Sequence, residues 1–365
     1  MNMDQMKLRP YDGFAIAGFL ILPWIFFTGP AMLARQSFGS AWMGILGAHV
    51  VVVLVFFIVT VLMNRHQGKD IILTACAVAG RPLGLLYGVL LTAYFCVSTG
   101  LLVRESAETF KVYGMELTPV YIIAGLIVLC AGAMNFFGGK AIVKSLGLFF
   151  IFILLGAAFT VILGLNRYNP DRLFPILGYG WPGIISSGVS TLCMIDGVII
   201  LALFAPDFAD IGKMRKSGTL AIAVCAAAAA MFYLCFIMTF SAPIAANMIS
   251  GFMEMGKSIY YNRFFYRFES ALLFFLIFAS VLTASLGLYI ARKSAALTFG
   301  ARKYKTLTVI PGAVILAVAL IPASLFDLVN RYFAFTRQYS VFFMAGVPLF
   351  LFVISSIKRM VGYEK

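Results

Sequence analysis

An aspartate lies near the middle of a long apolar stretch of the sequence. Asp196 stands within residues 191–199 and is followed by Gly197, which permits an irregular backbone. A carboxylate at the centre of a bilayer costs about 2.5–3.5 kcal/mol on insertion scales, so an acid in that place indicates a functional site. Asp196 would then bind the ammonium group of a solute or take up a proton that couples transport to a gradient. The structural alternative is a neutral acid that caps a broken helix.

A second unusual run interrupts the first apolar stretch. Pro23 and Pro30 each remove a backbone donor and clash with the preceding turn. Backbone groups freed in this way are tolerated at membrane depth only inside protein or beside a wet cavity. The run therefore predicts either an unwound stretch that holds a polar ligand through its backbone, or a simple proline kink. The candidate ligand-binding residues here are Pro23, Trp24, Ile25, Thr28 and Gly29.

Other polar side chains are candidates to line the same cavity. They are Tyr94 and Ser98 in the third apolar stretch, Cys193 beside Asp196, and Thr283 in the eighth stretch. The alternative for such small polar residues is helix packing, which is their commoner role in membranes.

Two pairs of opposite charge stand where apolar stretches meet their outer loops. Arg104 and Glu105 close the third stretch, and Arg267 and Glu269 open the eighth. Each pair predicts an outer gate over the cavity. The alternative is an ordinary interfacial ion pair, worth less than about 1 kcal/mol.

The elements that must position these residues are membrane helices. The chain is 62% hydrophobic and 12% charged, which would leave a soluble protein of 365 residues with an aggregating surface. A membrane span needs about 20 apolar residues. We therefore expect an all-α integral membrane protein with about ten transmembrane helices. The expected spans are Tyr11–Leu33, Ala41–Met63, Leu83–Val103, Pro119–Phe137, Ala141–Leu165, Gly183–Ala205, Thr219–Ser241, Ala271–Ala291, Leu307–Ser324 and Ser340–Ile357.

The two interruptions fall in the first and sixth of these spans. Paired discontinuous helices at corresponding places of two five-span halves are typical of inverted-repeat transporters with a binding site at the midplane. We expect one membrane domain over residues 1–365, with halves at 11–165 and 173–357 and with broken helices one and six. This arrangement predicts a small-solute transporter, or a receptor built on a transporter frame.

The formal net charge of +14 does not indicate nucleic-acid binding, because the cations are divided among the loops. Most Lys and Arg residues fall on the side of the N-terminus, so both termini are expected in the cytoplasm. A short amphipathic helix is expected between spans two and three on that side. The outer loop near 243–268 predicts a lid that lies along the membrane; an interfacial aromatic belt is the alternative.

Signatures of enzymes and cofactor sites are missing from the sequence. Gly138-Gly139-Lys140 lacks the spacing of a phosphate-binding loop, and two histidines are too few for a zinc protease motif. We expect no catalytic residue, metal or cofactor. The cysteines form no CxxC pair and are expected to be apolar fillers: Cys76, Cys96, Cys130, Cys193, Cys225 and Cys235.

Several motifs, in their order and spacing, resemble one family. The motifs are residues 30–42, Leu102-Val103-Arg104-Glu105, Leu173-Phe174-Pro175-Ile176-Leu177 and Arg267-Phe268-Glu269-Ser270-Ala271-Leu272. Over essentially its whole length the chain resembles the spore germination permease family. These proteins are the B subunits of nutrient germinant receptors, within the amino acid–polyamine–organocation transporter superfamily.

The resemblance implies a LeuT-like fold with a pocket between spans one, three, six and eight. It also implies recognition of a small nutrient, often an amino acid, by a subunit that acts with an A subunit and a lipoprotein C subunit in the inner spore membrane. The chain departs from the pattern at Pro23-Trp24-Ile25, where the superfamily has a small glycine-containing run, so Trp24 would reshape the carboxylate end of the pocket. The acid also precedes Gly197, where glycine followed by glutamate is expected.

Three functions follow from these observations. The first is a germinant-sensing subunit that binds a small nutrient and signals through partner subunits. The second is a gradient-coupled amino acid permease, which the buried acid favours. The third is a scaffold whose pocket is filled by Trp24.

Overall fold

A computed structural model describes residues 6–259, 268–300 and 306–360, and their regular structure is helical. The α-helices are α1 (Pro10–Ile21), α2 (Pro23–Phe26), α3 (Gly29–Ser37), α4 (Ala41–Arg65), α5 (Ile71–Ala79), α6 (Arg81–Tyr113), α7 (Val120–Phe136), α8 (Gly139–Leu163), α9 (Trp181–Ile195), α10 (Ile211–Phe240), α11 (Ala242–Ala245), α12 (Gly251–Ser258), α13 (Phe268–Phe299), α14 (Val309–Leu320), α15 (Leu325–Asp327), α16 (Phe333–Val341) and α17 (Val347–Met360). The 3-10 helices are η1 (Phe38–Ser40), η2 (Leu165–Arg167), η3 (Pro170–Leu173), η4 (Asp196–Asp207) and η6 (Thr306–Thr308), and the π-helices are η7 (Leu328–Tyr332) and η8 (Phe342–Gly346).

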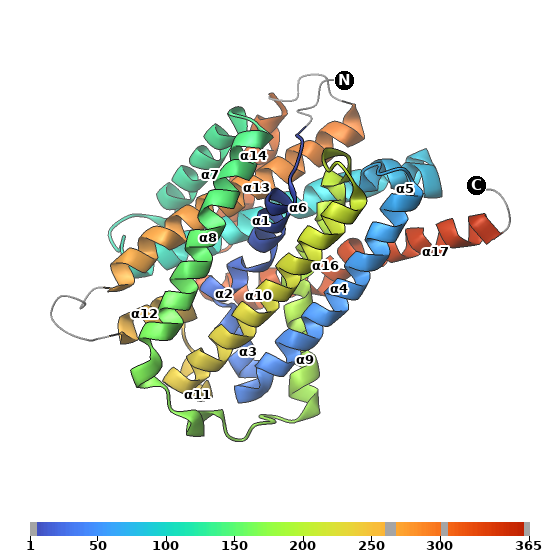
Figure 1. The fold of residues 1–365 in the computed structure, drawn as a ribbon. Coiled ribbons are helices and arrows are strands. Elements are labelled where there is room, and N and C mark those ends of the chain that lie inside the picture. Colours follow the sequence, from blue (N-terminus) through green and yellow to red (C-terminus); the bar gives the residue numbers. More distant parts are fainter. Residues whose placement is uncertain (1–5, 260–267, 301–305, 361–365) are drawn as a thin grey trace.

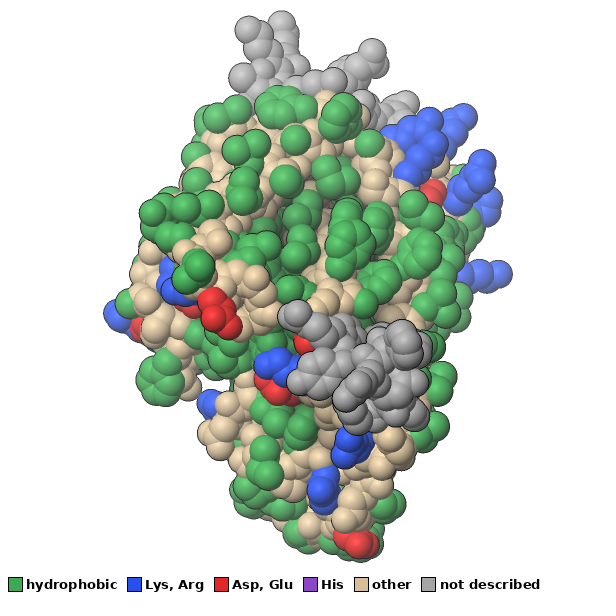
Figure 2. Space-filling view, turned by 90° about the vertical axis from the view of Figure 1, so that its left-hand side faces the viewer, with side chains coloured by type: hydrophobic (Ala, Val, Ile, Leu, Met, Phe, Trp, Pro, Cys, Tyr) green, Lys and Arg blue, Asp and Glu red, His purple; other side chains and the backbone are tan. Residues whose placement is uncertain are grey.

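Helices α4, α8 and α10 run side by side in Figure 1, α6 runs across their direction, and α11 and α12 lie at the lower left. Within the described residues, seven helical segments are long and apolar enough to cross a membrane: Gly29–Arg65, Arg81–Tyr113, Gly139–Leu163, Trp181–Asp207, Ile211–Phe240, Glu269–Phe299 and Leu325–Met360. The shorter apolar helices α1, α7 and α14 occupy the remaining expected places in the order. The chain is a multi-pass membrane protein, and Figure 2 shows a face on which hydrophobic side chains dominate.

The first apolar segment is interrupted at two points. Helix α1 ends at Ile21 and α2 begins at Pro23. Phe27, with φ −115° and ψ −139°, then separates α2 from α3. Each proline lies in the first turn of a new helix, where its missing N–H group costs nothing. Gly29 allows the chain to fold back, since a Cβ atom there would lie 2.5 Å from the backbone oxygen of Trp24.

The sixth segment changes its helix type at the aspartate. Helix α9 ends at Ile195, and the 3-10 helix η4 continues from Asp196 to Asp207. Runs of 3-10 helix longer than three or four residues are uncommon, and one inside a longer helix often accompanies a functional hinge. The interruption that the sequence predicts is therefore present as a change of helical pitch at Asp196.

The last span is longer than the expected Ser340–Ile357. The helical run begins at Leu325 and reaches Met360 through the two π-helical stretches η7 and η8. Its first half carries polar side chains such as Asn330, Thr336 and Arg337, and these concealed it from a reading based on apolar length. Helix α16 lies almost entirely in the part of this run that precedes the expected span.

The connections between spans contain two features that the sequence indicated. The expected short helix between spans two and three is α5, and Asp70 caps it by accepting hydrogen bonds from the amides of Ile72 and Leu73 at 3.0 Å. The loop expected near 243–268 contains α11 and α12, and Phe252 of α12 packs on Phe26 of α2 with ring centroids 4.9 Å apart. Its role as a lid stays a prediction. The aromatic run at 260–267 lies outside the described residues.

Close helix packing places the spans around the interruptions. Helix α13 packs along α6, while α4 packs against both α9 and α10. Gly44 makes the contact of α4 with α9 possible: a Cβ atom at this position would lie 2.3 Å from Ser187 Oγ and 2.7 Å from the amide nitrogen of Gly188. These contacts hold α6, α9 and α13 around the interrupted first segment.

Candidate functional site

A cavity of ≈ 180 Å³ lies where the two interrupted segments meet. Its walls come from the first segment, α6, the junction of α9 with η4, α13 and α16. The lining includes every candidate ligand-binding residue except Ile25. These lining residues are Pro23, Trp24, Thr28, Gly29, Tyr94, Ser98, Cys193, Asp196, Gly197 and Thr283. Ile25 is buried at 4% exposure and does not line the cavity, because successive helix residues point about 100° apart.

The Asp196 carboxyl is buried at 2% exposure on the cavity wall. Its Oδ1 atom accepts a long hydrogen bond of 3.4 Å from the Tyr94 hydroxyl, and the Ser340 hydroxyl also lies close. Among the described residues, Oδ2 has no hydrogen-bond partner. Buried polar atoms without partners are rare, so each one needs an explanation.

Within the described chain, Trp24 carries an unpaired hydrogen-bond donor, in contrast to the unpaired acceptor of Asp196. Its side chain lines the same cavity, and its indole Nε1 is a buried donor with no partner in the described part of the chain. An indole nitrogen can only donate, whereas an ionised carboxylate can only accept. Among the described residues, the cavity lining thus includes one side chain with an unpaired buried donor and one with an unpaired buried acceptor.

Glu105 also faces the cavity, and it binds the first interruption. Its Oε1 atom accepts hydrogen bonds from the Thr28 backbone amide at 3.1 Å and from the Thr28 hydroxyl at 2.5 Å. This carboxyl is buried at 5% exposure. The Glu105 carboxyl of α6 thus accepts a hydrogen bond from a backbone N–H group that has no partner within the broken helix.

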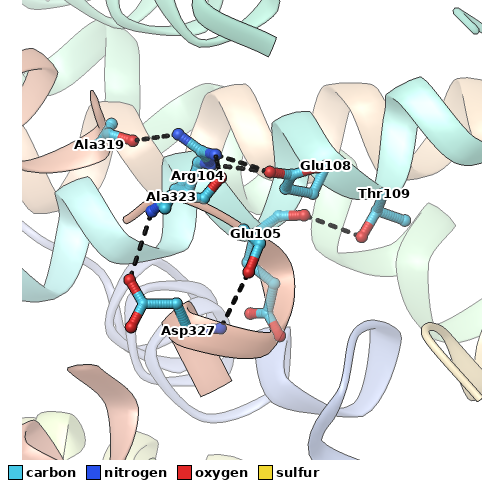
Figure 3. Close-up of polar contacts among 8 residues, drawn as sticks. Arg104, Glu105, Glu108, Thr109, Ala319, Ala323 and Asp327 are labelled. Atoms are coloured by element: carbon cyan, nitrogen blue, oxygen red, sulfur yellow. Dashed lines mark hydrogen bonds and ion pairs between the residues drawn. The ribbon is translucent and has the colours of Figure 1, made fainter. Parts of the chain in front are cut away.

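Arg104 and Glu105, which the sequence suggested as a gate pair, have different partners. Arg104 makes an ion pair with Glu108 at 2.8 Å and donates to the carbonyl oxygens of Ala319 at 3.3 Å and Ala323 at 3.4 Å (Figure 3). It therefore fastens α6 to the end of α14. Because neighbouring helix residues diverge, Arg104 faces α14 while Glu105 faces the cavity.

The other suggested gate pair cannot be compared in the same way. Arg267 lies outside the described residues, and Glu269 lies in the first turn of α13. A gating role for any of these charged residues stays a prediction.

The sequence reading missed one wall of the cavity. Helix α16 contributes Phe333, Thr336, Arg337 and Ser340. Their spacing of i, i+3, i+4 and i+7 places them on one helical face. That spacing is visible in the sequence, but it carried no signal as long as residues 325–339 were expected to form a loop.

Comparison with known proteins decides the family. The family model described as "Spore germination protein" (Spore_permease) matches residues 10–327. This chain belongs to that spore germination permease family. Spore germination protein A2 of Bacillus subtilis (strain 168) is 23% identical over 99% of this chain and 98% of the relative. Spore germination protein B2 of the same strain is 22% identical over 54% of this chain and 53% of the relative.

Solved structures show the fold. MhsT, crystallised in complex with L-phenylalanine, has a TM-score of 0.66 and 12% identity, covering 96% of this chain and 89% of MhsT. Mhp1 is a nucleobase-cation-symport-1 family transporter, solved in a closed conformation with bromovinylhydantoin bound. It has a TM-score of 0.59 and 15% identity, covering 95% of this chain and 80% of Mhp1. The family member therefore has a LeuT-like transporter fold and is a membrane protein of the germinant-receptor or permease type.

Proposed function

We propose that this chain is the membrane subunit of a nutrient germinant receptor, and that it binds a small nutrient such as an amino acid to trigger spore germination. Its family and its transporter fold support this proposal. In the proposal the subunit acts with A-type and C-type receptor subunits in the inner membrane of the spore, and both its termini are cytoplasmic.

The observation that carries the proposal is the Oδ2 atom of Asp196, a cavity residue, which has no hydrogen-bond partner in the part of the chain that the structure describes. A buried carboxylate oxygen in a membrane protein is costly unless something pairs with it. An ammonium group has three donors and no acceptor, so it suits this place. The Trp24 indole N–H, which no described residue accepts, supports a ligand that also has an acceptor.

The location of the cavity supports the same function. It lies at the meeting point of the two interrupted segments, which is where transporters with discontinuous helices bind their substrates. Thr28 and Gly29 at the first interruption and Gly197 at the second all line it. A ligand seated there contacts both interruptions, so binding can favour one arrangement of them over another.

Thermal unfolding of the full chain in lipid nanodiscs, with amino acids, sugars and nucleosides as additives, tests the proposal. A ligand that binds only the folded protein stabilises it by about 2.7 kcal/mol at a hundredfold excess over Kd. We expect a selective shift with an amino acid that is lost in Asp196→Asn. The matched control is Asp171→Asn, an exposed acid in η3, which should keep the shift.

Spores provide the physiological readout. Asp196→Asn spores should need a higher nutrient concentration to germinate at equal protein level, and an unchanged dose response would contradict the proposal. Uptake of labelled amino acid into proteoliposomes, with and without proton and sodium gradients, separates the receptor from a permease. If labelled amino acid accumulates only in the presence of a gradient, the protein is a transporter and not only a sensor.

A further inference from the structure

One basic side chain lines the cavity from the helix that the sequence reading missed. Arg337 lies on the same face of α16 as Ser340, three residues later, and both line the cavity. Residues at this spacing have Cβ atoms about 5–6 Å apart. Ser340 lies next to the Asp196 carboxyl. Arg337 and Asp196 thus line the same cavity, and the backbone position of Arg337 is about one helical turn from that of Ser340.

The surroundings of Arg337 hold the side chain without neutralising it. Its guanidinium carbon lies 5.3 Å from the centre of the Phe333 ring, and one nitrogen contacts the Met32 sulfur. Within the described part of the chain, no ion pair includes Arg337. An arginine has five donors in a planar fork that matches a carboxylate.

Glu105 is the acid that competes most directly for Arg337. Both residues line the cavity. Glu105 nevertheless gives its Oε1 atom to both donors of Thr28, and no ion pair within 4.0 Å joins it to Arg337 among the described residues. The fork of Arg337 therefore remains able to bind an anion that enters the cavity.

We propose that Arg337 binds the carboxylate of a free α-amino acid while Asp196 binds its ammonium group. This inference rests on the proposed function and names its substrate class: a zwitterion, with both charges on one carbon atom. The arrangement fits the energetics of a site at membrane depth. The ligand brings no net charge, and each of its charges meets a protein group of opposite sign, which avoids leaving a buried charge unpaired.

A comparison of each amino acid with its amide tests this assignment. The amide keeps the ammonium group and the side chain but lacks the carboxylate charge. The probes are L-alanine, L-leucine and L-phenylalanine with their α-amides, measured by equilibrium binding to the full chain in nanodiscs. We expect wild-type protein to bind at least one free acid at least about tenfold more tightly than its amide, because charged hydrogen bonds contribute most to such contacts.

Substitutions then locate the effect at Arg337. Arg337→Gln should weaken binding of the free acid by at least about tenfold and change binding of the amide by less than about twofold. Arg337→Lys should give an intermediate loss, because lysine keeps the charge but not the bidentate fork. Arg331→Gln is the matched control on the same helical run: Arg331 is exposed and does not line the cavity. Thermal unfolding without ligand shows which variants are folded.

The possible failures differ from one another. Equal affinity of wild-type protein for acid and amide, or equal losses for both in Arg337→Gln, would overturn the zwitterion assignment and leave nutrient binding in place. Binding of a sugar or nucleoside, with no amino acid binding, would do the same. Silence across the whole panel would overturn the proposed function together with this inference. The wild-type comparison of acid with amide holds even if a variant fails to fold.

Discussion

Thr28 donates both its backbone amide and its hydroxyl to Glu105, and so the break in the first segment is bonded to α6. The break needs such a partner, because an unpaired N–H group in a membrane protein costs free energy. The same carboxyl lines the cavity. The residue that stabilises the broken helix is therefore also part of the candidate binding site.

Removing the Glu105 carboxyl should destabilise the protein. Glu105→Ala leaves two buried donors of Thr28 without an acceptor, and we expect a loss of about 1–3 kcal/mol in the free energy of unfolding. Glu105→Gln keeps an acceptor oxygen and should lose less. Unfolding curves of both variants in detergent check this, and an Ala variant as stable as wild type would contradict it.

Substitution by alanine should affect protein stability differently at two glycines of α4. Gly44→Ala places a methyl group against Ser187 and the backbone of Gly188, and overpacking of this kind costs about 1–3 kcal/mol. At Gly47, no atom of the described residues lies within 4 Å of the position of an added Cβ atom, apart from those of the chain neighbours and the helix backbone itself. Gly47→Ala should leave stability unchanged or raise it by up to about 1 kcal/mol, because alanine favours the helix. Equal thermal midpoints for the two variants would contradict the close approach of α4 to α9.

The ion pair of Lys293 with Asp207 should show strong coupling. Both side chains are 8% exposed, and Asp207 also accepts a hydrogen bond from the Met6 amide at 3.3 Å. Lys293→Met leaves a buried carboxylate without its cation, at a cost of about 3–5 kcal/mol. The double variant with Asp207→Asn should recover part of that loss.

A half-exposed pair serves as the control for this experiment. Lys257 lies 3.5 Å from Glu254 and its side chain is 46% exposed. Lys257→Met should therefore change stability by less than about 1 kcal/mol. Additive effects of the Lys293 and Asp207 substitutions, measured by thermal unfolding, would show that their ion pair contributes nothing.

Asp70, which lies between α4 and α5, should make stability depend on pH. Burial raises the pKa of its carboxyl above the usual value, although its hydrogen bonds to the amides of Leu73 and Ile72 lower it. The folded protein then holds the proton more tightly than the unfolded chain. The resulting stability is present below the ordinary carboxyl pKa and is lost as pH rises through the raised one.

Asparagine at this position caps a helix as well as aspartate but does not titrate. As pH rises from about 4 to 7, wild type should therefore lose stability relative to Asp70→Asn, and the unfolding midpoint of the variant should rise relative to that of wild type. Asp171→Asn, at an exposed acid, provides the control for general pH effects. A difference that stays constant with pH would contradict the raised pKa.

The sequence was most informative where a residue type conflicts with its surroundings. Pro23 and Pro30 conflict with a continuous helix, and Asp196 conflicts with an apolar span; each conflict was resolved in the structure by an interruption at the cavity. The order of the spans followed from apolar length alone, because the bilayer sets that length. The ligand-binding and gating roles of these residues stay predictions.

The sequence was least informative where polar side chains face the inside of the bundle. Arg337 and Thr336 lower the apparent hydrophobicity of the last span, so apolar length alone predicts a loop in place of its first half. The partners of Arg104 and Glu105 could not be read from adjacency either. Direction around a helix axis decides such partners, and it places neighbours in sequence on different faces.

The small helix α12 is hydrogen-bonded to two of the elements that form the cavity. The Ser250 hydroxyl, which caps α12, donates to the Phe26 carbonyl at 2.5 Å, and the Tyr113 hydroxyl donates to Glu254 at 2.6 Å. Helix α12 thereby takes its position from the broken segment and from α6 together. Lys257, exposed on α12, is thus a natural attachment point for a fluorescent dye. The fluorescence of such a dye would report a rearrangement around Phe26, and the cavity itself would need no label.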